Sequence, residues 1–363
     1  MRVPLRTVSP AVDSVSLREK EPRMSISSRV RQLLTALGAG YLGLSAWNGW
    51  VWRRTRNLSF PAPLDGEANT YPWPGGMIYY TQRGRSDAEP VVLVHGIYAG
   101  ADSHEWRGIF EGLAERYQVY AYDLLGFGHS AHPYLRYSGP LYVRLLIDFL
   151  RAVVRRPATV VASSLSGGHA IRAASEAPDL IRRLILEAPT GQVGRMVEPS
   201  AGQQALYLAA NVLPDLGEGL RNLIATRTYI RSYLASQAYY DPSRISDETV
   251  NHGYISAHQP GGQYPLVAFL SGHLNVPIDD ALRSLSQPIS LIWGRQAKVT
   301  PLSDARRLLQ LQPRARLHVM EQTGLDAAQE RPQEFLRIVE DVLAGREAGA
   351  VSEQQLAEMA QQA

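Results

Sequence analysis

The stretch VVASSLSGG, residues 160–168, constrains the fold more than any other part of this 363-residue sequence. Its apolar residues up to Ala162 fit a short buried strand, and the glycine pair at its end opens a segment with helical spacing. A sharp turn between the two would present Ser164. Such a turn crowds the backbone, so the positions two before and two after the serine must be small, and here they are Ala162 and Ser166. The stretch therefore predicts a nucleophile elbow, with a Ser/Gly-rich helix N-terminus as the alternative.

Strands and helices are expected to alternate along most of the chain. Short apolar or alternating runs predict strands at 77–82, 90–94, 117–122, 159–162, 184–187, 289–293 and 317–321, and helical spacing occurs at 106–116, 141–154, 168–177 and 332–343. This order implies right-handed crossovers and an α/β fold, with a mostly parallel sheet covered by helices on both faces.

One long segment interrupts this alternation. Residues 190–281 are helix-like and rich in tyrosine, so we expect them to form a helical cap inserted into an α/β core made of residues 71–189 and 282–345. The tyrosines of the cap are expected to pack the lid, and they could also line an apolar pocket.

The N-terminal region holds the longest uncharged run. Residues 33–52 carry no charge over about the 20 residues that a helix needs to cross a bilayer, arginines flank both ends, and three tryptophans gather at the C-terminal end. We therefore predict a transmembrane helix at 33–52, with a disordered leader at 1–32, a linker at 53–70 and a tail at 346–363. The excess of Arg and Lys before the helix favours a main domain on the outer, or periplasmic, side of the membrane. A buried or surface-lying helix is the alternative, because four glycines and Asn48 weaken the hydropathy.

Composition excludes several kinds of chemistry. The sequence has no cysteine, which rules out disulfides, thiolate zinc sites and a cysteine nucleophile. The formal net charge is only +3, and no basic stripe with interleaved aromatic residues suggests a nucleic-acid surface. No metal-ligand spacing is present, and no cofactor is predicted.

Two loops should meet at the carboxyl edge of the sheet, where ligands bind in folds of this type. The loop HGIYAG, residues 95–100, and the residue after Ser164 can each direct a backbone N–H at a developing oxyanion, and these donors would be Ile97 and Leu165. His95 is expected to brace its loop. The loop of YDLLGFGHS, residues 122–130, should lie at the same edge.

Taken together, these segments resemble the α/β-hydrolase superfamily. The resemblance rests on HGIYAG, YDLLGFGHS, ASSLSGG, LIWGRQAKVTP and TGLDAAQERPQEF, in that order, and covers residues 71–345. It implies an eight-stranded, mostly parallel sheet, a helical lid, and a catalytic triad of serine, then an acid, then histidine.

The sequence departs from that family at the triad. Where the family places its acid after the WG-containing strand, this chain has Ala297, and where it places histidine behind a glycine, this chain has Leu325. A serine needs a base to remove its proton, and the base needs an orienting carboxylate. Asp326 follows the histidine position, but a carboxylate is a feeble base at neutral pH unless burial raises its pKa.

Substitute partners have to come from elsewhere in the chain. Glu187, at a strand end, is a candidate acid, and His258 of the cap is a candidate base; the other histidines considered are His129, His169 and His273, while His318 lies in a predicted strand. Two functions follow from these residues. One is a serine hydrolase that uses Ser164 and a degenerate triad on small or lipid-like, apolar acyl esters. The other is an inactive member of the fold that binds ligands or serves as a scaffold.

Overall fold

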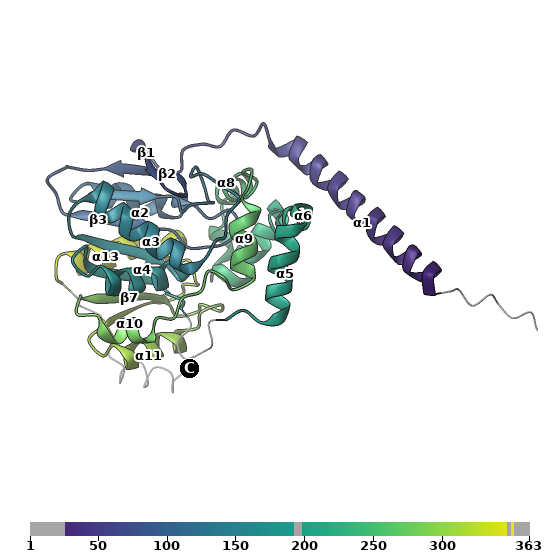
Figure 1. Cartoon of the computed structure of the whole chain (residues 1–363). Helices are drawn as coiled ribbons and strands as arrows, with labels where there is room; N and C mark the ends of the chain where they lie inside the picture. Colours follow the sequence, from purple (N-terminus) through teal and green to yellow (C-terminus); the bar gives the residue numbers. More distant parts are fainter. Residues whose placement is uncertain (1–25, 192–197, 347–349, 352–363) are drawn as a thin grey trace, which may run out of the picture. The chain divides into compact units, whose positions relative to one another are not determined.

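The core of the protein is an eight-stranded sheet (Figure 1). The computed structural model describes residues 26–191, 198–346 and 350–351. The strands are β1 (Glu67–Trp73), β2 (Gly76–Arg83), β3 (Pro90–Val94), β4 (Gln118–Tyr122), β5 (Ala158–Ser163), β6 (Ile181–Glu187), β7 (Ile289–Gly294) and β8 (Arg316–Met320). Their order in space is β1-β2-β4-β3-β5-β6-β7-β8.

Most of the sheet is parallel. β2 pairs antiparallel with β1 and with β4, and every other neighbouring pair is parallel. Val94 pairs with Ala162, and Ser163 pairs with Glu187, so the ends of β3, β5 and β6 lie side by side. This alignment brings the loops that follow these strands to one edge of the sheet.

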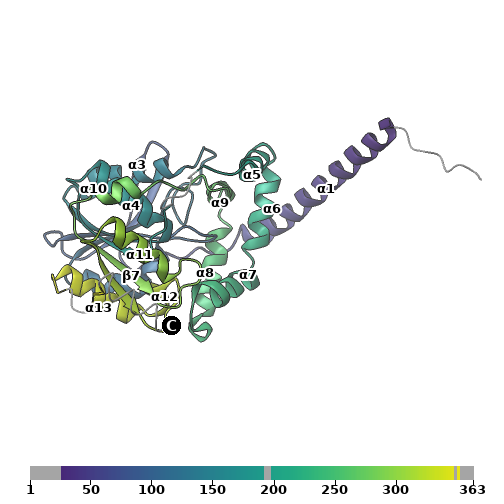
Figure 2. The ribbon, with the colours of Figure 1, turned by 90° about the horizontal axis from the view of Figure 1, so that it is seen from below.

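Helices cover both faces of the sheet, as predicted. One face packs on α2 (Arg107–Ala114), α12 (Ala327–Glu330) and α13 (Pro332–Leu343). The other packs on α3 (Gly139–Phe149), α4 (Ser164–Glu176), α10 (Asp279–Ser284) and α11 (Leu302–Leu311), and Figure 2 shows this layer from a second direction. The central strands are apolar throughout because successive side chains face opposite layers: Val91 and Leu93 face α2, and Val92 and Val94 face α4.

A helical segment joins β6 to β7. It contains α5 (Ala201–Val212), α6 (Pro214–Ile224), α7 (Arg227–Tyr233), α8 (Asp247–Ala257) and α9 (Gln263–Leu270), with short 3₁₀ and π segments between some of them. Figure 1 shows α5, α6, α8 and α9 gathered beyond one end of the strands. These helices occupy the segment for which a cap is predicted at 190–281; residues 192–197 of that prediction lie outside the described residues.

The predicted transmembrane helix needs a correction. Residues 33–52 do lie in a helix, α1 (Ile26–Thr55), but in the described part of the chain no helix is both long enough and apolar enough to cross a membrane. Glycines and polar side chains lower the hydropathy of α1. The predicted outer-side location of the main domain stays a prediction.

The C-terminal part of α1 packs within the main body of the molecule. Asn48 is only 2% exposed, its amide group donates to Asp215 O at 2.9 Å, and it accepts a hydrogen bond from Asn222 at 3.0 Å. Ser45 Oγ donates to the Asp215 carboxylate at 2.6 Å. The polar residue that weakens the hydropathy of α1 therefore serves to fix this helix on α6.

Three predicted boundaries also differ from the structure. Helix α1 begins at Ile26, inside the predicted leader at 1–32, whose residues 1–25 lie outside the described part. The predicted linker at 53–70 is shorter, because α1 runs to Thr55 and β1 begins at Glu67, where it pairs with Gln82. Of the predicted tail, Arg346 and residues 350–351 are described, and Val351 N–H donates to Leu317 O of β8.

Candidate active site

Ser164 stands at the junction of β5 and α4 with strained backbone geometry. Its φ is 49°, in the left-handed region that a serine rarely adopts. Two contacts hold the turn: Thr190 N–H donates to Ser164 O at 3.0 Å, and Ser166 Oγ donates to His95 O at 2.6 Å. A Cβ on Gly167 would lie 2.7 Å from Pro189 Cβ, so the helix after the turn needs glycine there. The local geometry is that of a nucleophile elbow.

Ser164 lines a cavity of about 190 Å³ between the sheet edge and the cap. The walls come from the loop after β3, the elbow, the loop after β8 and helices of the cap. Most of the lining is apolar, and the apolar side chains are Ile97, Ile224, Ile230, Leu234, Leu266, Phe269, Leu270, Val299 and Leu325. Such a pocket, apolar with a few polar groups, is the usual form of a small-molecule site.

The loop after β3 is braced by His95. Leu124 N–H donates to His95 Nε2 at 3.0 Å, which leaves the proton on Nδ1, and Nδ1 donates to Gly96 O at 2.6 Å. Burial lowers the pKa of His95 to about 4, so the ring is neutral at pH 7. This structural role matches the one predicted. Ile97, one of the two predicted oxyanion donors, lines the cavity, and Leu165 follows Ser164 in the first turn of α4.

The two positions that usually complete the triad are filled by buried aliphatic side chains. Ala297 is 6% exposed and Leu325 is 8% exposed, and both belong to the main hydrophobic core. The loops that carry them fit closely: Gln296 N–H donates to Thr323 O at 3.0 Å, and a Cβ on Gly294 would lie 1.9 Å from Gly324 O. The backbones of these two loops therefore meet tightly, and the replacement of the acid and the histidine there stays a prediction.

Glu187, the predicted substitute acid, is buried at the end of β6. Its Oε1 accepts the Ala328 N–H at 2.8 Å, so the carboxyl group caps the first turn of α12. Burial raises the pKa of Glu187 to about 8. The side chain does not belong to the cavity lining, and its catalytic role stays a prediction.

Two other buried acids do line the cavity. Asp326 follows Leu325, and burial, with a smaller contribution from Glu330, raises its pKa to about 7. Glu105 lies in a short 3₁₀ helix, Ser103–Trp106, and its Oε2 accepts the Gly96 N–H at 3.0 Å. Burial, together with Glu187 and Asp326, raises the pKa of Glu105 well above its ordinary value. The condition under which a carboxylate becomes a useful base at neutral pH is therefore met at Asp326.

His258, the predicted substitute base, lies outside the cavity lining. Its Nδ1 contacts Tyr254 O at 2.7 Å, and burial lowers its pKa to about 4. The structure thus does not bring His258 to Ser164. The other histidines named from the sequence are likewise outside the lining and make contacts elsewhere: His129 with Pro61 O, His169 with Leu274 O, and His273 stacked on Tyr207, while His318 lies within β8.

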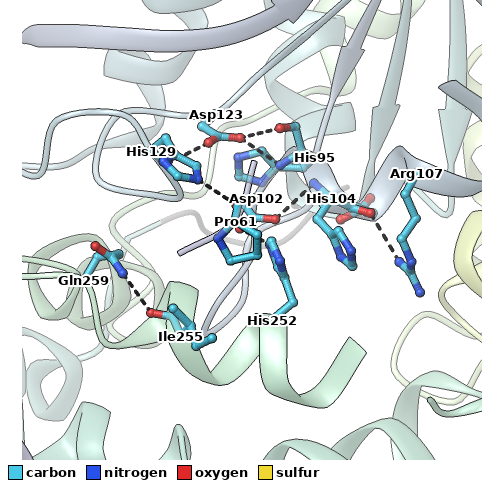
Figure 3. A network of polar contacts seen from close by, with 12 residues as sticks. Pro61, His95, Asp102, His104, Arg107, Asp123, His129, His252, Ile255 and Gln259 are labelled. Atoms are coloured by element: carbon cyan, nitrogen blue, oxygen red, sulfur yellow. Dashed lines mark hydrogen bonds and ion pairs between the residues drawn. The ribbon is translucent and has the colours of Figure 1, made fainter. Parts of the chain in front are cut away.

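A histidine that the sequence did not single out lies in the cavity wall instead. His252 of α8 bonds through Nε2 to the Asp102 carboxylate at 2.7 Å, and His104 stacks on its ring at 3.8 Å between centroids (Figure 3). All three residues line the cavity with Ser164. Burial alone would raise the pKa of Asp102, but the hydrogen bond and charge of His252 outweigh it, so that the pKa is lowered. Asp102 lies two residues after the HGIYAG loop in the sequence. This closeness to a loop of the predicted site is the one sequence signal that could have pointed to it.

This fold and this site define a family. The family model for the alpha/beta hydrolase fold matches residues 89–328, which is more than half of the chain. The protein belongs to the α/β-hydrolase fold family.

Relatives with known names are hydrolases. The chain is 29% identical over 267 residues to 2-hydroxy-6-oxo-2,4-heptadienoate hydrolase of Pseudomonas putida strain F1, covering 71% of this chain and 90% of that protein. It is 30% identical over 267 residues to a 2-hydroxymuconate semialdehyde hydrolase of Pseudomonas putida, covering 71% and 88%. Among solved structures, the meta-cleavage product hydrolase CumD of Pseudomonas fluorescens IP01 matches with a TM-score of 0.62 at 26% identity, covering 76% of this chain and 97% of that one.

Proposed function

We propose that this protein is a hydrolase for small, apolar acyl compounds, with Ser164 as its nucleophile. The observation that carries the proposal is the left-handed backbone of Ser164, which presents the side chain to an apolar cavity. Strain of this kind costs on the order of 1–3 kcal/mol and is found at functional sites when the surroundings enforce it. The hydrolase names of the relatives support the same reaction class.

The base in this proposal is His252. Because Asp102 occupies Nε2, it would hold the ring in place and leave Nδ1 to take the serine proton, as the acid does for the base in a triad. Ser164 Oγ donates no hydrogen bond to another residue in the described ranges. Catalytic hydrogen bonds often tighten only in the substrate complex, so His252 would approach Ser164 when a substrate draws the cap inward.

A second candidate is a protein that binds ligands without hydrolysing them. Ala297 and Leu325 favour it, because loss of one triad member commonly costs a factor of about 10⁴ in kcat. In that case the cavity would keep its apolar ligand and Ser164 would have no chemical role.

Labelling of the full-length chain with a fluorophosphonate distinguishes the two candidates. We expect wild type to be labelled and to hydrolyse short p-nitrophenyl esters, Ser164→Ala to lose both activities, and the exposed-site control Ser236→Ala to keep both. The two histidines in and directly after α8 should differ in their effect on kcat. His252→Asn should lower kcat by about 100-fold or more, and His258→Asn should leave kcat within a few-fold of the wild-type value. If the folded wild type and Ser164→Ala both show neither labelling nor ester hydrolysis, the binding protein is favoured.

A further inference from the structure

The charged groups around the cavity are unevenly distributed. Its lining contains the carboxylic acids Asp102, Glu105 and Asp326 but neither lysine nor arginine. Asp102 is paired with His252, whereas Glu105 and Asp326 face no cation of the lining. His104 does not compensate for them, because burial lowers its pKa to about 3 and keeps the ring neutral.

Glu105 is the less satisfied of these two acids. It is 4% exposed, and although its Oε2 accepts the Gly96 N–H, its Oε1 is buried without a hydrogen-bond partner. An unpaired buried polar atom costs about 1–3 kcal/mol, and more when the group is charged. Oε1 itself is fully enclosed by protein, so what Glu105 offers to a ligand in the cavity is the negative charge of its carboxylate.

Glu105 also lies beside the nucleophile. A Cβ built on Gly96 would be 3.4 Å from Glu105 Oε2 and 3.7 Å from Ser164 Cβ, so one small region separates the acid from the serine. A donor group held by Glu105 would thus belong to the same ligand that Ser164 contacts.

Arg107 does not belong to the cavity lining and is bonded to other side chains. It donates to Gln329 Oε1 at 3.0 Å and to Thr249 Oγ1 at 2.7 Å, and these two side chains belong to the lining. In the described residues no group of three or more potential ligands is arranged to hold a metal ion.

We propose that the Ser164 cavity selects molecules with an apolar body and a cationic amine end, and that Glu105 and Asp326 bind that end. The proposal deepens the hydrolase function, since it assigns the substrate class of the same site. It also separates this chain from relatives whose names specify dienoate substrates, because a carboxylate here would meet two unpaired acids. Neutral apolar molecules would bind with intermediate affinity.

The proposal implies that binding depends on pH. Asp326 interacts with the acids Glu330, Glu105 and Glu187 and with the hydroxyls of Tyr98, Tyr233 and Tyr239, and the Gln329 amide lies 3.5 Å from its carboxylate. Glu105 interacts with Glu187, Asp326, Tyr98 and Ser163. Burial raises the pKa of Asp326 to about 7, so Asp326 gains and loses its proton near neutrality, and burial raises the pKa of Glu105 as well. An alkylammonium ion, whose pKa resembles the value of about 10.4 for lysine, must displace those protons. Its affinity should therefore rise from pH 6 to pH 8.

Calorimetric titration of the full-length protein with three six-carbon probes tests the proposal. At pH 8 we expect hexylammonium to bind about ten-fold more tightly than hexanol and hexanoate to bind least. The isosteric variants Glu105→Gln and Asp326→Asn should each weaken hexylammonium binding about ten-fold while hexanol binding stays unchanged. Glu115→Gln, at an exposed position beside α2, is the matched control and should behave as wild type.

Three outcomes would overturn the proposal: hexanoate binding as tightly as hexylammonium, no effect of either isosteric variant beyond that of Glu115→Gln, or no binding of any probe to the folded protein. Because these titrations need no turnover, they can succeed in a protein without hydrolase activity. Conversely, labelling of Ser164 by a fluorophosphonate can succeed even when amines do not bind, so the two proposals fail independently.

Discussion

The elbow at Ser164 and the two loops after β7 and β8 all have closely packed backbones, but the side chains that they present differ in chemistry. At the elbow, strained backbone presents a serine to the cavity. At the other two loops, equally tight backbone contacts around Gly294 and Gly324 present Ala297 and Leu325. The two loops predicted to carry the acid and the histidine are thus closely packed, and the residues at the predicted positions are aliphatic.

This difference shows that fit and reactivity are separate properties of the site. The loop backbones must pack against the sheet whatever side chain they carry, because Gly294 and Gly324 leave no room for a methyl group. Of the residues at the tips, Leu325 lines the cavity and Ala297 is buried in the main hydrophobic core. Changes to the tips should therefore alter chemistry, and changes to the glycines should alter stability.

The largest effect is expected from placing the triad side chains on the existing loops. The double variant Ala297→Asp, Leu325→His should raise kcat/KM for p-nitrophenyl acetate by about 100-fold, because base and acid act on the serine as a unit. Each single variant should gain much less. Addition of Ser164→Ala to the double variant should abolish the gain. A double variant that melts cooperatively but shows no gain would mean that the cavity itself no longer admits a triad geometry.

A smaller effect, on stability, is expected from the loop glycines. Gly294→Ala places a methyl group 1.9 Å from Gly324 O, which is backbone and cannot rotate away, so the free energy of unfolding should fall by roughly 3 kcal/mol or more. Gly202→Ala in α5, where nothing lies within 4 Å, is the control and should stabilise by about 0.5–1 kcal/mol. Urea unfolding measures both. Equal midpoints would contradict a rigid fit of the two loops.

The smallest effect is expected at the elbow itself. Ser164→Gly should raise the free energy of unfolding by about 1 kcal/mol or less, since glycine adopts a positive φ without strain but loses more chain entropy on folding. Ser164→Ala keeps the strain and should leave the thermal melting temperature near that of wild type. If Ser164→Gly melts below Ser164→Ala, relief of the positive φ does not stabilise the protein and the strain argument is wrong.

The sequence was sufficient for the parts of the molecule that depend on local pattern. The alternation of strands and helices, the elbow at Ser164 and the aliphatic residues at positions 297 and 325 all follow from short segments, and the fold class was predicted correctly on that basis. The transmembrane helix was predicted wrongly from the same kind of pattern. The absence of charge alone does not make a helix apolar enough to span a membrane, and near the end of this one Asn48 and Val51 are buried against protein.

The parts that could not be predicted depend on contacts between distant segments. His252 meets Asp102 across 150 positions of sequence, and nothing in α8 distinguishes that histidine from His258 on the same helix until the cap is placed. The importance of Glu105 likewise arises from its burial next to Gly96. The local sequence pattern therefore identifies the turn that presents Ser164, whereas the groups around Ser164 are set by the tertiary packing.

The contact of α1 with α6 has a practical consequence for work with shorter chains. A chain cut after the apolar helix would lose Ser45 and Asn48 and leave Asp215 and Asn222 without two of their hydrogen-bonding neighbours. The side of α6 that the C-terminal part of α1 contacts would become exposed to solvent. This matters for the site because Ile224, the last residue of α6, lines the cavity. A shortened chain should therefore keep the residues from Leu44 onward, because Ser45 and Asn48 hold the C-terminal part of α1 on α6.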